Sequence, residues 1–307
     1  MSTESAQAPS LSYPSGMVVA MGWSIPQTLS PSSMGAFTSC PLAFRFSYVQ
    51  RLPEPPSAPA SKGTLVHRCL ERLLDRPADE RTLDAALADL SRAADELAAH
   101  PEFSGLELNE EELARFRSDA EGLVRRYFEI EDPRTIRPIG LEIKLAANLG
   151  KVTVRGIIDR LELDEDGEFV ITDYKTGSTP SERWEEKSLA GVHIYAHLCE
   201  QNFGKRPAKV QLMYLSKPEL IIATPTAGSL RSVASKSSAV MDAVKRACAN
   251  DDFRPNESVL CNYCSFKEFC PKFGGNPEQA VVVLRERAEI AAGRPPLPFN
   301  DAPLATV

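Results

Sequence analysis

Charged residues interrupt two apolar stretches where a buried sheet would exclude them. The segment "GIIDRLELDEDGEFVITDYKTG", residues 156–177, has the pattern of two strands joined by a turn at "DEDG". Asp159 lies in the first strand, and Asp173 and Lys175 lie in the second. Residues two apart share one face of a strand, so Asp173 and Lys175 point the same way, and the hairpin can bring Asp159 beside them. The pattern predicts two carboxylates and an ammonium on one sheet face.

Two carboxylates beside an ammonium can hold a hard divalent cation and a water molecule. Mg²⁺ prefers oxygen ligands and binds through one or two carboxylates together with substrate phosphate. A bound cation polarises a phosphate oxygen and lowers the pKa of its water, while Lys175 would orient that water or stabilise developing charge. The alternative is a cross-strand ion pair on a solvated face, which is the commoner reading of an isolated Asp-x-Lys.

Composition limits the other classes of function. The chain has 307 residues, of which 43% are hydrophobic and 25% charged, as in globular proteins with a core. Its net charge of −7 argues against a generic polyanion-binding surface but leaves room for a local basic groove. The N-terminus lacks the pattern of a secretory signal, and no stretch approaches the ~18 apolar residues of a membrane helix. We therefore expect a cytoplasmic protein with no membrane partner.

The order of the remaining patterns predicts an α/β fold. Residues 1–28 are rich in Ser, Pro and Ala and are expected to form a disordered tail. Ser30 and Pro31 are typical of a helix start, and residues 53–63 read as a Pro-rich loop. Three amphipathic helices follow, then a β-rich region from about Pro138, a helix ending at Gly204, two more strands and a further helix. A mixed central sheet flanked by helices, with the helical N-terminal region folded back onto it, follows from this order.

Several of these motifs, in this order, resemble the RecB-like nucleases of the PD-(D/E)XK superfamily. The match covers "GIIDRLEL", "FVITDYKTG", "SMGAFTSCPLAFRFSYV" and "KGTLVHRCLERLL", the last corresponding to a Gly-Thr-x-x-His helix whose histidine binds metal. The resemblance implies a restriction-endonuclease-like fold over residues 29–275, followed by a C-terminal helix and flexible tail over 276–307. It also implies a deoxyribonuclease that uses Mg²⁺ or Mn²⁺.

The resemblance assigns roles residue by residue. His67, Asp159, Asp173 and the backbone carbonyl of Tyr174 would hold the metal, and Lys175 would be the catalytic lysine. On pattern alone, a histidine on an apolar helix face is more often a packed core residue. Glu142 matches a strand-borne glutamate of relatives, with a surface ion pair as an equal alternative.

Contacts to DNA are less clearly marked in the sequence. Tyr195 fits the tyrosine of a Gln-x-x-x-Tyr helix motif found in relatives, but Gly191 stands where they have glutamine. Tyr195 and Arg160 are the candidate DNA contacts. The departure at Gly191 bears on how a DNA strand is positioned and leaves the metal site unaffected.

A cluster of cysteines near the C-terminus indicates a second metal site. Cys261, Cys264 and Cys270 lie in the ten-residue stretch "CNYCSFKEFC", which in a reducing compartment is typical of metal binding. Cys69, Cys199 and Cys248 fall within amphipathic helix patterns and are expected to be small core residues. The spacing fits structural Zn²⁺ as well as an iron–sulfur cluster. Resemblance to AddB and CRISPR-adaptation nucleases adds Cys40 as fourth ligand and implies a 4Fe–4S cluster that joins the ends of the domain.

The combined prediction is an exonuclease that acts on single-stranded or frayed DNA ends, in DNA repair, recombination or defence. No G-x₄-G-K-[ST] loop is present in the sequence, so a helicase would be a separate partner. The alternative is a DNA-end-binding or adaptor subunit of a repair or CRISPR-adaptation complex with a vestigial site. The complete set of His67, Asp159, Asp173 and Lys175 favours the enzyme.

Overall fold

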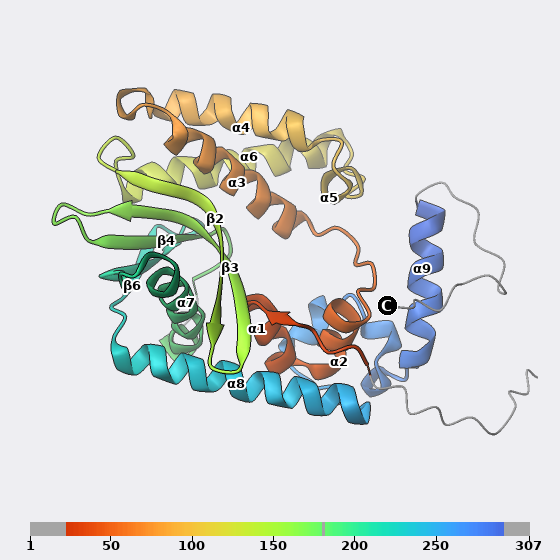
Figure 1. The fold of residues 1–307 in the computed structure, drawn as a ribbon. Helices are drawn as coiled ribbons and strands as arrows, with labels where there is room; N and C mark the ends of the chain where they lie inside the picture. The colour runs from red at the N-terminus through yellow and green to blue at the C-terminus, as the bar shows by residue number, and fades with distance from the viewer. Residues whose placement is uncertain (1–22, 180–181, 292–307) are drawn as a thin grey trace, which may run out of the picture.

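The computed structural model describes residues 23–179 and 182–291 (Figure 1). Its strands are β1 (Thr28–Leu29), β2 (Pro138–Leu149), β3 (Val152–Leu163), β4 (Phe169–Lys175), β5 (Lys209–Tyr214) and β6 (Glu219–Ala223). Its helices are α1 (Pro31–Ser39), α2 (Pro41–Phe44), α3 (Ala58–Asp75), α4 (Leu83–Leu97), α5 (Pro101–Ser104), α6 (Glu110–Ile130), α7 (Glu182–Phe203), α8 (Ala227–Asn250) and α9 (Ala280–Ala291). A π-helical turn spans Arg45–Val49, and short 3₁₀ turns span Ala78–Glu80, Val259–Tyr263, Lys267–Phe269, Pro271–Phe273 and Pro277–Gln279.

Strand β3 organises the sheet because three other strands pair with it. Antiparallel β2 follows one edge of β3 along its length. The other edge is shared: parallel β1 pairs with Thr153 and Val154, and antiparallel β4 pairs with residues 160–163. The sheet then continues through parallel β5 to antiparallel β6. This mixed sheet confirms the predicted fold class.

Helical layers cover both faces of the sheet. One core cluster joins α1, α7 and α8 to one face, with residues such as Ile158, Leu198 and Val244 fully or almost fully buried. A second cluster joins α3, α4 and α6 to the opposite face through residues such as Leu70 and Tyr174. Figure 1 shows α3, α4 and α6 on one side of the sheet and α8 on the other. The helical N-terminal region thus folds back onto the sheet, as predicted.

Local signals placed most element ends correctly. Ser30 caps α1, accepting a hydrogen bond from the Ser33 backbone N–H, and Pro31 opens the helix. Helix α7 ends before Gly204, whose φ of 71° few other residues adopt. The Pro-rich loop was predicted too long, because α3 begins at Ala58. Proline is tolerated in the first turn of a helix, where its missing N–H has no partner to lose, and Pro59 lies there.

The folded region also begins earlier than predicted. Residues 1–22 of the expected tail lie outside the described part, but Trp23 donates from its backbone N–H to the Cys248 carbonyl and from its indole to Asp251. Thr28 begins β1. At the other end α9 provides the expected C-terminal helix, and residues 292–307 lie outside the described part. Within the described residues, no helix is long and apolar enough to cross a membrane.

A buried arginine connects the sheet to the N-terminal helical region. Arg160 on β3 is fully buried. Its guanidinium contacts both carboxylate oxygens of Glu131, just after α6, and donates to the Tyr174 hydroxyl at 2.9 Å. It also pairs with Glu162 at 3.1 Å and donates to Thr172 at 3.0 Å. The expectation that Arg160 contacts DNA is therefore wrong for this structure, because its side chain is fully buried and its guanidinium is held by groups of the protein.

Replacing Arg160 with Met should destabilise the fold. The change leaves Glu131 and Glu162 unpaired in a poorly solvated environment, and breaking a buried pair in this way commonly costs about 3–5 kcal/mol. The measurement is the free energy of unfolding in urea. Arg254→Met is the control, because Arg254 pairs with Asp252 on the surface and should change stability by no more than about 0.5 kcal/mol. Equal stability of the two variants would contradict the role assigned to Arg160.

Candidate active site

Strands β3 and β4 separate at the two predicted aspartates. They pair from Leu163↔Phe169 up to Arg160↔Thr172. The next residue on each strand is Asp159 and Asp173, respectively, so the carboxylates lie where the strands begin to diverge. Asp159 Oδ2 accepts a hydrogen bond of 2.8 Å from the Tyr174 backbone N–H, which fixes its carboxylate beside β4. The hairpin therefore brings the two aspartates together, as the sequence predicted.

Helix α3 adds His67 to this group. The imidazole Nε2 lies 3.1 Å from the Tyr174 carbonyl oxygen, and Nδ1 lies 3.6 Å from Asp159 Oδ2. The approach of the helix depends on Gly63, where a Cβ would meet the Thr176 hydroxyl at 3.2 Å. The geometry explains the spacing of the "KGTLVH" motif. Gly63 lets α3 approach the end of β4, and His67 lies one helical turn later, where it reaches the site.

Glu142 completes a set of metal-ligating side chains. Its Oε1 lies 3.7 Å from His67 Nδ1, and donor atoms of His67, Glu142 and Asp159 all lie within 4.8 Å of one another. Glu142 has a φ of 49°, a left-handed conformation that is uncommon for a glutamate and that recurs at functional sites. The sequence had left Glu142 undecided between this site and a surface ion pair. The structure places it at the site.

Asp173 and Lys175 share a face and interact directly. Lys175 Nζ forms an ion pair with Asp173 Oδ2. The aspartate is buried, whereas the lysine side chain is 42% exposed. Tyr174 between them points to the opposite face, with its ring edge-on to Tyr127 of α6. The Lys175 side chain therefore extends from the sheet to solvent, while the Asp173 carboxylate stays buried.

The crowded carboxylates alter the proton affinities of the site. Burial raises the pKa of Asp159 to about 7, and the nearby charge of Asp173 raises it too, against the lowering effect of His67. Burial lowers the pKa of His67, but contacts with Glu142 and Asp159 outweigh it and leave that pKa above its usual value. Burial likewise lowers the pKa of Lys175, and the charge of Asp173 reverses this into a net rise. The site holds excess negative charge that a cation would neutralise.

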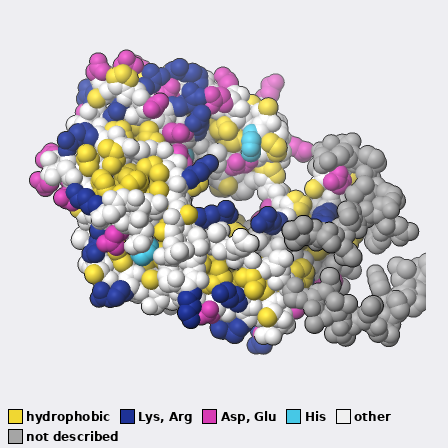
Figure 2. Space-filling model, viewed as in Figure 1, with side chains coloured by type: hydrophobic (Ala, Val, Ile, Leu, Met, Phe, Trp, Pro, Cys, Tyr) yellow, Lys and Arg dark blue, Asp and Glu magenta, His cyan; other side chains and the backbone are white. Residues whose placement is uncertain are grey.

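A cavity of about 710 Å³ opens onto these residues. His67, Glu142, Asp159, Asp173 and Lys175 line it at one end, and Tyr195 of α7 lies in its wall. Burial and the three carboxylates raise the pKa of the Tyr195 hydroxyl, in keeping with its place beside them. Its ring packs against Gly156, where a Cβ would come within 3.0 Å. Figure 2 shows a hollow on this face between α3 and the β1–α1 segment, with Lys and Arg side chains at its rim.

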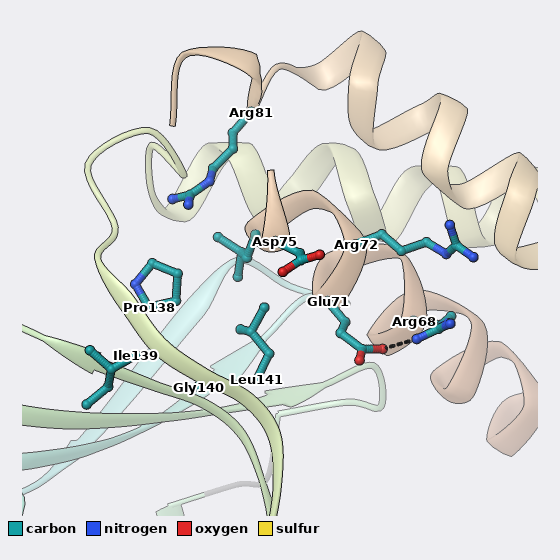
Figure 3. Close-up of a pocket in the computed structure, with 10 residues that line it drawn as sticks. Arg68, Glu71, Arg72, Asp75, Arg81, Pro138, Ile139, Gly140 and Leu141 are labelled. Atoms are coloured by element: carbon teal, nitrogen blue, oxygen red, sulfur yellow. Dashed lines mark hydrogen bonds and ion pairs between the residues drawn. The ribbon is translucent and has the colours of Figure 1, made fainter. Parts of the chain in front are cut away.

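A second cavity, of about 650 Å³, lies between α3 and the start of β2 (Figure 3). Three arginines line it, but each already interacts with carboxylates or backbone carbonyls of the protein. Arg68 pairs with Glu71, and Arg72 pairs with Glu96. Arg81 donates to the carbonyls of three residues, Arg76, Pro133 and Ile136. This second cavity therefore offers an anion little free positive charge.

Four cysteines from opposite ends of the folded region come together. Burial raises the pKa of the Cys264 thiol, and the nearby sulfurs of Cys40, Cys261 and Cys270 raise it further. The segments that carry them are in contact, because the Asn256 amide donates to the Ser39 carbonyl at 2.9 Å and the rings of Phe46 and Phe266 lie 5.0 Å apart. The other three cysteines, Cys69, Cys199 and Cys248, are fully buried, as predicted.

Several residues that line the first cavity were not predicted from the sequence. Ser30 and Ser32 reach it from the start of α1, and Lys144 and Arg155 reach it from β2 and β3. Strand β1 has two residues, too few for a hydrophobic pattern to reveal, so nothing in the sequence placed Ser30 beside Arg155. Alternation along β2 and β3 could have shown that Lys144 and Arg155 face away from the α7 side.

Comparison with known proteins agrees with this geometry. Residues 28–271 match the family model described as the PD-(D/E)XK nuclease superfamily. No curated protein sequence is significantly similar to the chain.

Two solved structures are similar to this one. A provisionally assigned exonuclease from Eubacterium rectale has a TM-score of 0.49 and 14% identity, over 78% of this chain and 87% of that one. A protein called SSO0001 has a TM-score of 0.37 and 12% identity, over 80% of this chain and 86% of that one. The family model matches most of the chain, and the mixed sheet presents Asp159, Asp173 and Lys175 where two strands diverge. The chain therefore belongs to the PD-(D/E)XK nuclease superfamily.

Proposed function

We propose that this protein is a Mg²⁺- or Mn²⁺-dependent deoxyribonuclease of the RecB-like type, acting as an exonuclease on single-stranded or frayed DNA ends. The observation that carries the proposal is the convergence of His67, Glu142, Asp159, Asp173 and Lys175 on one cavity. These residues come from α3, β2, β3 and β4, and packing alone gives no reason to gather four acid–base groups and a lysine there. A repair, recombination or defence role, with a helicase or repair complex as partner, accords with that activity.

The donor set fits a hard divalent cation. Asp159, Asp173, Glu142 and the Tyr174 carbonyl offer oxygen, and His67 offers an imidazole nitrogen, a combination that suits Mg²⁺ and Mn²⁺. The cation would polarise the scissile phosphate and lower the pKa of a bound water. The raised pKa of Asp159 supports this fit. In the absence of a cation, the buried and crowded carboxylate holds its proton more tightly, and a metal ion would supply the positive charge in place of that proton.

Lys175 would act as a cation in this reaction. Its raised pKa keeps the amine protonated at neutral pH, so it is suited to stabilising negative charge on a phosphate oxygen. The ion pair with Asp173 holds Nζ at the cavity. Asp159 is held by the Tyr174 N–H, and Tyr195 in the cavity wall remains the candidate DNA contact.

Asp173→Ala should abolish metal-dependent cleavage of DNA. The change removes one proposed ligand and the partner of Lys175, and the loss of one electrostatic contact in a transition state costs about 10²–10³ in rate. The measurement is digestion of end-labelled and circular DNA, single- and double-stranded, with Mg²⁺ or Mn²⁺. Asp166→Asn, in the turn between the same two strands, is the matched control and should keep activity.

Three outcomes decide the proposal. Loss of cleavage in Asp173→Ala alone supports it, and digestion of linear but not circular DNA supports the exonuclease assignment. Full activity in Asp173→Ala would overturn the role of this site. A wild-type protein that binds DNA ends but never cuts them would favour the adaptor alternative.

Stability should fall with rising pH unless a divalent cation is present. Asp159 has a folded pKa of about 7 against 3.8 for the free group, so folding is increasingly disfavoured from about pH 4 to about pH 7. The raised pKa of His67 acts in the same direction, because its stabilising contribution is lost as pH rises through the folded value. A bound cation favours the carboxylate and should offset this loss.

The measurement is the Tm across this pH range in EDTA and in Mn²⁺. Because other groups also titrate, the informative quantity is the difference between wild type and Asp159→Asn, which should lack most of the pH-dependent loss and most of the response to Mn²⁺. Parallel Tm curves for the two proteins in EDTA would contradict the prediction.

The four cysteines are proposed to hold a 4Fe–4S cluster, with structural Zn²⁺ as the alternative. A tetrahedral Cys₄ zinc site, with Zn–S near 2.3 Å, would place its sulfurs roughly 3.8 Å apart. Among the described residues, no three of the four sulfurs lie within 4.8 Å of one another, although all four are neighbours. The nuclease motifs in the same chain favour the iron–sulfur cluster over zinc. Such a cluster would join Cys40 to Cys261, Cys264 and Cys270 as a staple across residues 29–275, the proposed extent of the nuclease domain.

Anaerobically purified protein should be brown and contain about four irons per chain, since a cubane cluster holds four. Cys261→Ser should lower both iron content and Tm. Cys248→Ser, at a buried cysteine outside the set, is the control and should keep its iron. One zinc per colourless chain would replace the cluster by a zinc site without affecting the nuclease proposal.

A further inference from the structure

The cavity occupies a gap in the sheet. Strands β1 and β4 pair with the same edge of β3, β1 as far as Val154 and β4 from Arg160 onward. Within residues 23–179 and 182–291, no strand pairs with residues 155–159 of β3 on that edge. Ser30 and Ser32, just after β1, line one end of the cavity, and Asp173 and Lys175 of β4 line the other. The gap is about 16–17 Å long at the usual rise per residue in a strand.

The two ends of the gap carry opposite charge. The end near β4 holds the acidic metal site, whereas Arg155 follows directly after the β1 pairing and Lys144 lies opposite Ile157, midway along the gap. The register pairs Lys144 with Ile157 and Ala146 with Arg155, so the two cations are diagonal neighbours on one face, within reach of a common ligand. Both are exposed, and within the described residues neither forms an ion pair. The arginines of the second cavity, by contrast, are already engaged.

An apolar residue lies between Arg155 and the metal site on β3, directly opposite Lys144. Ile157 lines the same cavity and is 43% exposed, although polar groups surround it there. Along β3 the order on this face is Arg155, Ile157 and then Asp159, each step about 6.6–6.8 Å. An anion held by the two cations, an apolar contact beside it and a second phosphate at the metal site match the alternation of phosphate and sugar-base in one nucleic-acid strand.

We propose that Lys144, Arg155 and Ile157 form a subsite for the nucleotide next to the scissile phosphate, on a single DNA strand lying in the gap. The two cations bind that nucleotide's phosphate, and Ile157 packs against its sugar or base. Strands β1 and β4 bound the gap at its two ends, and the subsite accepts one strand at a time. This inference rests on the proposed nuclease function and adds the direction in which the strand leaves the metal site.

The test measures binding separately from cleavage. A fluorescein-labelled oligodeoxythymidine of about ten nucleotides, within the range that single-strand sites cover, is titrated in EDTA at several salt concentrations. Lys144→Gln/Arg155→Gln should raise Kd about tenfold at low salt. It should also make the slope of log K against log salt shallower by about 0.7, the contribution of one neutralised phosphate on a single strand. Ile157→Ser should raise Kd and leave the slope unchanged, because it removes no charge.

Lys245→Gln/Arg246→Gln is the matched control, as it removes the same charge from exposed positions on α8 outside the cavity. It should keep the wild-type slope. Equal salt slopes for the cavity variant and the control would overturn the proposed subsite. The nuclease proposal would still stand in that case if the wild-type protein cleaved DNA with Mn²⁺. Tighter binding of a duplex than of the single strand, with the same loss in the cavity variant, would overturn the single-strand assignment. A wild type that neither binds nor cuts DNA would defeat the nuclease proposal itself.

Discussion

The site depends on the point at which β3 and β4 stop pairing. Two antiparallel strands that stayed paired would satisfy their backbone groups with each other and leave no space between them. Here the Tyr174 N–H, two residues beyond the last pair, donates to the Asp159 carboxylate. Just below, the Arg160 guanidinium holds Thr172 and the Tyr174 hydroxyl and so fixes the position of the divergence. The opening between the strands is therefore built into the fold and needs no ligand to create it.

Sequence reasoning found the parts of this site that local patterns encode. Alternation along residues 156–177 placed Asp173 and Lys175 on one face, and the turn signal at Asp164–Gly167 brought Asp159 beside them. Resemblance to a family supplied His67, which pattern alone would have assigned to a core. The class of fold followed from the order of helices and strands. These features depend on residues that are close together in the sequence, so a single sequence is enough to predict them.

The features that sequence reasoning misjudged, left open or missed depend on distant partners. Arg160 follows Asp159 directly and looked like a surface cation, but Glu131 and Glu162 enclose it once α6 packs on the sheet. Glu142 reaches the site through a left-handed backbone that strand alternation cannot anticipate. The two-residue strand β1 has no detectable periodicity, yet it brings the start of α1 to the cavity. In each case the decisive contact joins elements far apart in the chain.

The connection between the two ends of the folded region also has a consequence for biosynthesis. Strand β1 can pair only after Thr153 and Val154 have been synthesised. Trp23 and Cys40 have their partners still later in the chain, around Cys248 and Cys261–Cys270. A chain still emerging from the ribosome lacks these partners until residue 270 has been translated. The segment that brings Ser30 and Ser32 to the cavity thus gains its last anchoring partners long after the cavity's own lining, which ends at Tyr195, has been translated. A nascent chain therefore completes this nuclease-superfamily site late.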